Sequence, residues 1–168
     1  MISHDPNDAI EVVLIDDNPA DQEIARRVFG SRSTVCRLRI LSDGDQALTY
    51  LDPNLNDEVF GSKELPDLIL MDINMPRLSG LDVLRAVKAD KSLRHIPVLM
   101  LTTSSLESDI LDSYRCGCSG YILKPIDVLH FSSLLAELLH YWTHVATLPD
   151  RMNRHGDDAI SDLPGGSL

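Results

Sequence analysis

Five short apolar segments recur along the chain, and stretches with helical periodicity separate them and follow the last one. The segments are EVVLI (11–15), VCRLRIL (35–41), LILM (68–71), VLML (98–101) and YIL (121–123). Alternating strands and helices are typical of βα units built around a parallel sheet. The pattern therefore predicts an α/β protein with five strands and five helices.

The second segment alternates between apolar and charged residues. Cys36, Leu38 and Ile40 share one face of a strand, while Arg37 and Arg39 share the other. Central strands of a parallel sheet are buried on both faces and have continuous apolar sequences, so the alternating segment is expected at an edge. Five such units match a flavodoxin-like, doubly wound sheet with strand order 2-1-3-4-5.

Capping residues mark the ends of the predicted helices. Asn18 followed by Pro19 indicates an N-cap with proline at the first helical position. Ser104 and Glu107 form the S-x-x-E pattern of a capping box, and Gly117 is expected to end that helix. The other predicted N-caps are Ser79 and Asp127.

One folded domain is expected over residues 10–147, between an N-terminal extension (1–9) and a flexible C-terminal tail (148–168). The tail is poor in apolar residues and contains Gly, Pro and Asp, a composition that cannot bury enough surface to fold. Residues 52–67, DPNLNDEVFGSKELPD, form a connection longer than is usual between such elements, which predicts a surface excursion.

Carboxylates follow two of the predicted strands. Asp16 and Asp17 come directly after the first strand, and Asp72 follows the third. In the order 2-1-3-4-5 these strands are neighbours, and ligands bind at their carboxyl ends. Three carboxylates at one rim suit Mg²⁺, which prefers oxygen ligands and leaves room for a phosphoryl oxygen. The plainer alternative is three solvated aspartates that cap helices.

The remaining two strands end in residues that can bind an oxyanion. Thr102 follows the fourth segment and Lys124 the fifth. A hydroxyl and an ammonium at the same rim would bind a tetrahedral oxyanion that arrives next to a metal. Taken alone, Thr102 could cap a helix, and a lysine before Pro125 could simply be exposed.

Composition narrows the class of protein. The net charge of -11 argues against binding of nucleic acid, because contact with the phosphate backbone requires a basic surface. No apolar run reaches the roughly 20 residues of a membrane helix, and the N-terminus MISHDPNDAI lacks signal-peptide features. We therefore expect a cytoplasmic protein whose three cysteines are reduced.

Four motifs together resemble the receiver domain of bacterial two-component response regulators of the single-domain kind. They are LIDDNPAD, LILMDINMPRLSGLDVL, IPVLMLTTS and GYILKP, and the resemblance covers residues 10–145. Within that family, DDNPAD and the WTHVATLP ending look most like regulators paired with bacterial phytochrome photoreceptor kinases.

The resemblance implies that Asp72 accepts a phosphoryl group from a sensor histidine kinase, here a bacteriophytochrome. It implies that Mg²⁺ is bound by Asp17 directly, by Asp16 through water, and by Asp72 and the backbone carbonyl of Asn74. Such a protein is a signalling protein rather than an enzyme, and it removes its own phosphoryl group only slowly.

Further residues take their roles from the same resemblance. Lys124 and Thr102 would contact phosphoryl oxygens, and a cis peptide bond before Pro125 would aim Lys124 at the site. Tyr121 would turn inward behind Thr102 and alter the face made by the fourth helix, fifth strand and fifth helix, although it could equally be static. Thr103 departs from the family, in which alanine or glycine is common, so the lifetime of the acyl phosphate stays open.

The last predicted helix has an apolar arc wider than the roughly 100° stripe that a surface helix needs. We expect part of it to form a homodimer contact through Leu138, Tyr141, Trp142 and Val145. A helix that is set deeply into its own domain would show the same arc.

Two other functions compete with the receiver. Mg²⁺-dependent phosphohydrolases with an aspartate nucleophile need a second carboxylate two residues later, but Asn74 occupies that position. A dimeric scaffold that works without phosphorylation would keep the fold, yet it gives no reason for the carboxylates, hydroxyl and ammonium to share one rim. The sequence identifies neither the stimulus nor the downstream target.

Overall fold

A computed structural model describes residues 9–52, 54–55 and 65–149, and its sheet has the predicted topology. Five parallel strands are ordered β2-β1-β3-β4-β5. They are β1 (Ile10–Ile15), β2 (Cys36–Leu41), β3 (Leu68–Met71), β4 (Val98–Thr102) and β5 (Gly120–Leu123). The alternating segment forms β2 at one edge, as expected, with its two arginines exposed.

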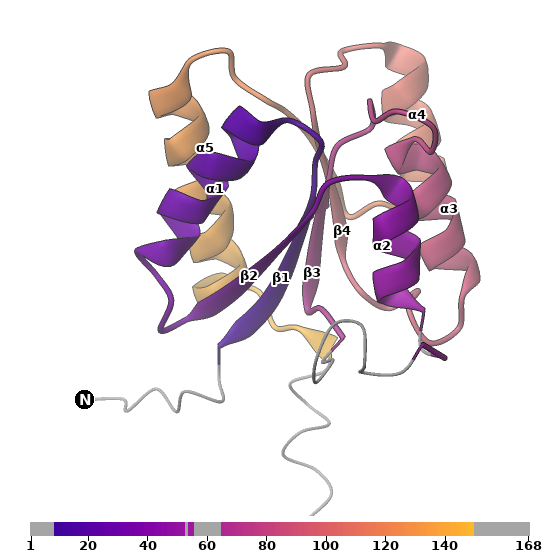
Figure 1. The fold of residues 1–168 in the computed structure, drawn as a ribbon, viewed down its shortest axis with the longest axis horizontal. Helices are drawn as coiled ribbons and strands as arrows, with labels where there is room; N and C mark the ends of the chain where they lie inside the picture. The colour runs from indigo at the N-terminus through magenta and orange to yellow at the C-terminus, as the bar shows by residue number, and fades with distance from the viewer. Residues whose placement is uncertain (1–8, 53, 56–64, 150–168) are drawn as a thin grey trace, which may run out of the picture.

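Five α-helices cover the two faces of the sheet, which confirms the doubly wound fold (Figure 1). Helices α1 (Pro19–Gly30) and α5 (Val128–His140) lie on one face. Helices α2 (Gly44–Leu51), α3 (Gly80–Ala89) and α4 (Glu107–Arg115) lie on the other. A short π-helix, η2 (Tyr141–Val145), extends α5.

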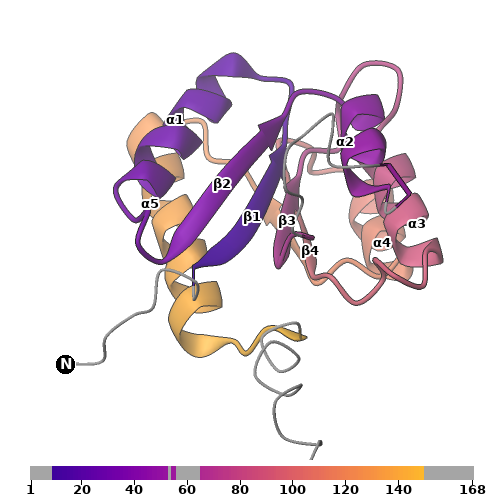
Figure 2. The same ribbon diagram turned by 60° about the horizontal axis from the view of Figure 1, so that its bottom comes forward.

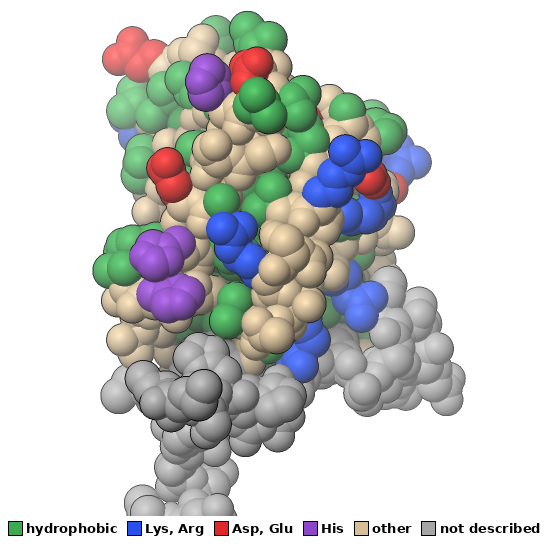
Figure 3. Space-filling model, turned by 90° about the vertical axis from the view of Figure 1, so that its left-hand side faces the viewer, with side chains coloured by type: hydrophobic (Ala, Val, Ile, Leu, Met, Phe, Trp, Pro, Cys, Tyr) green, Lys and Arg blue, Asp and Glu red, His purple; other side chains and the backbone are tan. Residues whose placement is uncertain are grey.

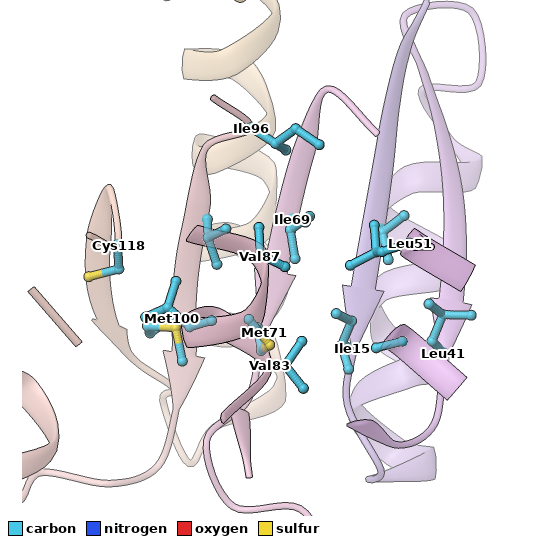
Figure 4. Close-up of a cluster of buried hydrophobic side chains, with 14 of the residues drawn as sticks. Ile15, Leu41, Leu51, Ile69, Met71, Val83, Val87, Ile96, Met100 and Cys118 are labelled. Carbon is cyan, nitrogen blue, oxygen red and sulfur yellow. The ribbon is translucent and has the colours of Figure 1, made fainter. Parts of the chain in front are cut away.

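Each strand contributes alternate side chains to two separate cores. Ile15, Met71 and Met100 point toward α2 and α3, where they pack in the cluster shown in Figure 4. Leu14 and Leu70 point the other way and pack with residues of α1 and α5. Because both faces are buried, the central strands contain continuous apolar sequence.

Most of the predicted caps are present. The side chain of Asn18 accepts from the N–H of Ala20, and that of Asp127 accepts from His130. Ser79 and Asp82 form a reciprocal capping box at α3. Gly117 has φ 97°, the left-handed conformation expected after α4.

The capping box predicted for Ser104 and Glu107 is wrong. Helix α4 begins at Glu107, and its N-cap Leu106 makes no side-chain cap bond. Ser104 lies in the preceding loop, where its hydroxyl is 2.5 Å from Oδ2 of Asp109 and its N–H donates to Thr102. These bonds to neighbouring groups replace the cap.

After η2 the chain crosses the N-terminal ends of the strands (Figure 2). Leu148, which the sequence assigned to the tail, is buried in the core of the α1 and α5 layer. Pro149 lies near Pro97, just before β4. Residues 150–168 and most of the 52–67 connection lie outside the described residues. Among the helices of the described part, none is long and apolar enough to cross a membrane.

Candidate functional site: a carboxylate cluster at the switch point

Strand register brings the predicted site residues to one rim. Ile15 pairs with Met71 across β1 and β3, so the aspartates that follow these two residues are neighbours. Ligand oxygens of Asp16, Asp17 and Asp72 all lie within 4.8 Å of one another. The predicted convergence of three carboxylates is therefore present in the structure.

The three carboxylates differ in exposure. Asp16 is fully buried and Asp72 nearly so, whereas Asp17 is exposed. Oδ1 of Asp16 accepts from the N–H of Asn18 at 2.9 Å, and the side chain of Gln22 donates to the Asp16 carbonyl at 2.6 Å. Burial raises the pKa of Asp16 above its ordinary value, although the hydrogen bond from Lys124 acts in the opposite direction. An exposed carboxylate beside two buried ones leaves the cluster open to solvent on one side.

Lys124 is the cation of the site. Its Nζ lies 2.6 Å from Oδ2 of Asp16, 2.9 Å from Oδ2 of Asp21 and 3.2 Å from Oδ2 of Asp72. Burial alone would lower the pKa of this ammonium, but the bonds and charges of the carboxylates outweigh it and hold the pKa above its ordinary value. The sequence had not identified Asp21 as a partner.

The expected cis bond before Pro125 is wrong, since none of the described peptide bonds is cis. The backbone of β5 positions Lys124 instead. Leu123 pairs with Thr102 across the strands, and the N–H of Lys124 donates to the Thr102 carbonyl at 2.8 Å. This pairing alone brings the lysine to the rim.

Thr102 and Tyr121 are joined through Ser104. The N–H of Ser104 donates to the buried Thr102 hydroxyl at 3.2 Å, and the Tyr121 hydroxyl donates to the Ser104 carbonyl at 2.8 Å. Burial raises the pKa of Tyr121, which keeps the donor proton on its hydroxyl. Ser104 thus couples the predicted oxyanion-binding hydroxyl to the predicted switch residue.

The β3–α3 loop approaches the Asp72 carboxylate closely. The N–H of Asn74 donates to Oδ1 of Asp72 at 3.3 Å. A side chain at Gly80 would place its Cβ 2.0 Å from the backbone oxygen of Asp72, so only glycine fits there. No role was assigned to Gly80 from the sequence.

The donor set fits a hard divalent cation. Carboxylate oxygens from two strand ends, one of them exposed, match the one or two carboxylates plus waters that hold Mg²⁺. Asp16, Asp17, Asp21 and Asp72 place four carboxylates around the single ammonium of Lys124. The excess of negative charge favours a cation at this rim.

The family model for the response regulator receiver domain matches residues 12–136. The chain belongs to this family. The receiver resembles Rcp1 from Synechocystis sp., with 30% identity over 148 residues, 88% of this chain and 99% of the relative. A probable methanogenesis regulatory protein, FilR2 from Methanothrix harundinacea, is 32% identical over 135 residues, 80% of this chain and 84% of the relative.

Solved structures of response regulators, among them a phytochrome response regulator, have the same receiver fold. The phosphorylated cyanobacterial phytochrome response regulator RcpA superposes with a TM-score of 0.77 and 31% identity, covering 84% of this chain and 99% of that one. The Mn²⁺-bound form of Rcp1 gives a TM-score of 0.76 and 29% identity, covering 83% and 99%. The phytochrome-associated regulators are therefore homologues of this receiver.

The predicted dimer residues of the receiver fall into two groups. Leu138 and Trp142 pack partly against their own α1 and α5 core, whereas Tyr141 and Val145 are 49% and 63% exposed. The wide apolar arc of α5 is thus largely explained by burial within the chain. The face of α1 and α5 also shows histidines and arginines among the apolar side chains (Figure 3).

Proposed function

We propose that this receiver is a cytoplasmic protein that accepts a phosphoryl group on Asp72 from a sensor histidine kinase in a Mg²⁺-dependent reaction. The observation that carries the proposal is the cluster of Asp16, Asp17 and Asp72 with Lys124 at the switch point of a receiver fold. The similarity to solved bacteriophytochrome response regulators supports a bacteriophytochrome as the kinase.

Asp72 is the nucleophile of the proposed reaction. One of its carboxylate oxygens forms a bond to phosphorus while the bond from phosphorus to the kinase imidazole nitrogen breaks. The imidazole keeps the electron pair and leaves neutral when its other ring nitrogen carries a proton. Because the transition state of phosphoryl transfer is loose, the receiver contributes mainly positioning and neutralisation of charge.

The groups that would hold Mg²⁺ are Asp17, Asp16, Asp72 and the carbonyl of Asn74. The ion would supply positive charge at the phosphoryl oxygens. Lys124 already reaches Asp72 at 3.2 Å, so it can donate to an oxygen of the group attached there. Thr102 would donate its hydroxyl proton to another oxygen. Its hydroxyl already accepts from the N–H of Ser104, which leaves that proton free for the phosphoryl group.

The signal would leave through Tyr121 and the surface of α4, β5 and α5. Movement of Thr102 toward a phosphoryl group would pull on Ser104, whose carbonyl accepts from the Tyr121 hydroxyl. The backbone of Tyr121 is in turn linked to α4, because its N–H donates to the Tyr114 hydroxyl at 3.2 Å. A shift at the phosphorylation site would therefore reach α4 through three hydrogen bonds.

Incubation with Mg²⁺ and acetyl phosphate tests the assignment. Intact-mass measurement should find one phosphate per chain that is labile to base, and Asp72→Asn should carry none. Rapid turnover of unrelated phosphate esters would instead favour a phosphohydrolase. A chain that takes up no phosphate at all would favour the scaffold.

Homodimerisation through the end of α5 is a separate part of the proposal. Tyr141 and Val145 supply the exposed apolar surface there. Replacing both with serine should convert a dimer to a monomer in sedimentation analysis without affecting the fold. A wild-type chain that sediments as a monomer, both before and after phosphorylation, would eliminate this contact.

A further inference from the structure

Helices α1 and α3 both carry an aspartate at their third position, and the two side chains behave differently. In α3, the carboxylate of Asp82 turns back and accepts from both the N–H of Ser79 at 3.2 Å and its hydroxyl at 2.8 Å. In α1, Asp21 turns away from the helix and accepts from Nζ of Lys124 at 2.9 Å. Asp82 completes a cap, whereas Asp21 reaches into the phosphorylation site.

The start of α1 leaves Asp21 free for this contact. The N–H of Asn18, which a capping box would direct to Asp21, donates to Oδ1 of Asp16 at 2.9 Å instead. The side chain of Asn18 accepts from the N–H groups of Ala20 and Asp21. The cap is thus complete without the Asp21 carboxylate, and helix stability does not explain its orientation.

Lys124 has no spare donor in this arrangement. An ammonium has three N–H bonds, and Asp16, Asp21 and Asp72 each accept one. The lysine side chain is only 4% exposed, so water replaces none of these partners easily. Asp21 is the one of the three that belongs neither to the metal cluster nor to the acceptor position.

We propose that Asp21 is a positioning residue that acts through Lys124, slowing phosphoryl transfer to Asp72 while strengthening cation binding at the carboxylate cluster. The inference rests on the proposed function. Asp21 holds the Lys124 ammonium toward α1. In the proposed reaction that ammonium must instead donate to an oxygen of the incoming phosphoryl group, so the contact with Asp21 slows the transfer. Its own negative charge also repels a phosphodonor.

Asp21 slows phosphoryl transfer, but we expect it to increase the affinity of the carboxylate cluster for a divalent cation. The ammonium of Lys124 shares its charge among three carboxylates, two of which are candidate metal ligands. Without the charge of Asp21, the ammonium neutralises Asp16 and Asp72 more fully, and the rim also loses one negative charge. Both changes weaken the attraction for a divalent cation.

Asp21→Asn separates these two effects because it keeps the size of the side chain and removes its charge. At saturating Mg²⁺, phosphorylation by acetyl phosphate should become about tenfold faster, the scale of one charge-assisted hydrogen bond. The affinity of the unphosphorylated protein for Mn²⁺, measured by electron paramagnetic resonance, should fall several-fold. Asp21→Ser should reproduce both changes, and Asp21→Glu should restore the slow rate.

Glu23→Gln is the matched control, since Glu23 lies on the same helix and pairs with Arg26 and Arg27 rather than with Lys124. It removes the same charge and should alter neither quantity. Equal rates and equal Mn²⁺ affinities for wild type and Asp21→Asn would overturn the inference, as would a change of the same size in Glu23→Gln. A wild-type chain that never gains phosphate would instead overturn the proposed function, while the Mn²⁺ comparison would still test Asp21.

Discussion

Lys124 is buried at one end of the sheet and Lys88 is partly buried at the other, and their partners shift the pKa of the two ammonium groups in opposite directions. Lys124 at the C-terminal rim bonds to three carboxylates, which hold its pKa above the ordinary value despite burial. Lys88, near the end of α3, donates to the backbone carbonyls of Arg94 at 3.0 Å and Ile96 at 2.7 Å. Burial lowers the pKa of Lys88, because neutral carbonyls do not compensate for lost hydration.

The difference separates the end of the receiver that is proposed to be functional from the opposite end, where the contacts are structural. At the C-terminal rim, buried charges depend on one another and on any bound cation. At the N-terminal ends of the strands, Lys88 binds the loop before β4 through hydrogen bonds to uncharged backbone carbonyls. Leu148 attaches the last described segment of the chain to the domain by apolar contact. Variants at the two ends should therefore respond differently to Mg²⁺.

Lys124→Met should have the largest effect on stability. Without a divalent cation, the free energy of unfolding should fall by about 3–5 kcal/mol, the cost of leaving partners of a buried ion pair without their counter-charge. Mg²⁺ should restore more stability to the variant than it adds to the wild type, because the ammonium no longer repels the cation. Urea unfolding with and without Mg²⁺ measures both quantities.

Lys88→Met is the matched control for that experiment. Loss of two hydrogen bonds to neutral carbonyls should cost about 1–2 kcal/mol. Mg²⁺ should stabilise this variant by the same amount as the wild type. An equal response to Mg²⁺ in Lys124→Met and Lys88→Met would contradict the proposed contrast between the two ends.

Leu148→Ala should be next in size. The side chain is 1% exposed within the core of α1 and α5, so its truncation should cost about 2–5 kcal/mol. Thermal or urea unfolding gives the value, and the exposed Val145→Ala should change stability by less than about 0.5 kcal/mol. A loss no greater than that of Val145→Ala would mean that the segment after η2 does not belong to the folded domain.

The sheet and the main site residues were predictable because their signals are local in sequence. Strands buried on both faces give continuous apolar runs, and the order of a doubly wound sheet brings Asp16 and Asp72 together from separate strands. Lys124 was predictable for the same reason, since it directly follows β5. Position after a strand was enough to place all three.

The contacts that were not predicted from the sequence have physical causes that a single sequence does not reveal. Asp21 at the third position of a helix indicates a cap, and only the three-dimensional structure shows that Asp16 has taken the N–H it would bind. Ser104 matches a capping box, but bonds to Thr102 and Tyr121 hold it in the loop. Leu148 follows the last helical turn and precedes Pro149, so no helical or strand periodicity indicates its burial.

The smallest predicted effect is a pH dependence that distinguishes Lys88 from Lys124. The pKa of Lys88 in the folded state lies below its ordinary value of 10.5, so between these two values the unfolded chain binds more protons. Stability contributed at Lys88 therefore rises with pH through that window. Lys124 has the opposite sign, because its raised pKa makes the native state lose stability as pH rises beyond 10.5.

The difference in stability between wild type and Lys88→Met isolates the Lys88 contribution, since both chains share every other titrating group. This difference should grow as pH rises toward about 10, where the unfolded lysine is still largely protonated. Urea midpoints measured at several pH values in this range give the slope. A difference that stays constant with pH would show that Lys88 has the same pKa in both states, and the contrast between the two lysines would then rest on their partners alone.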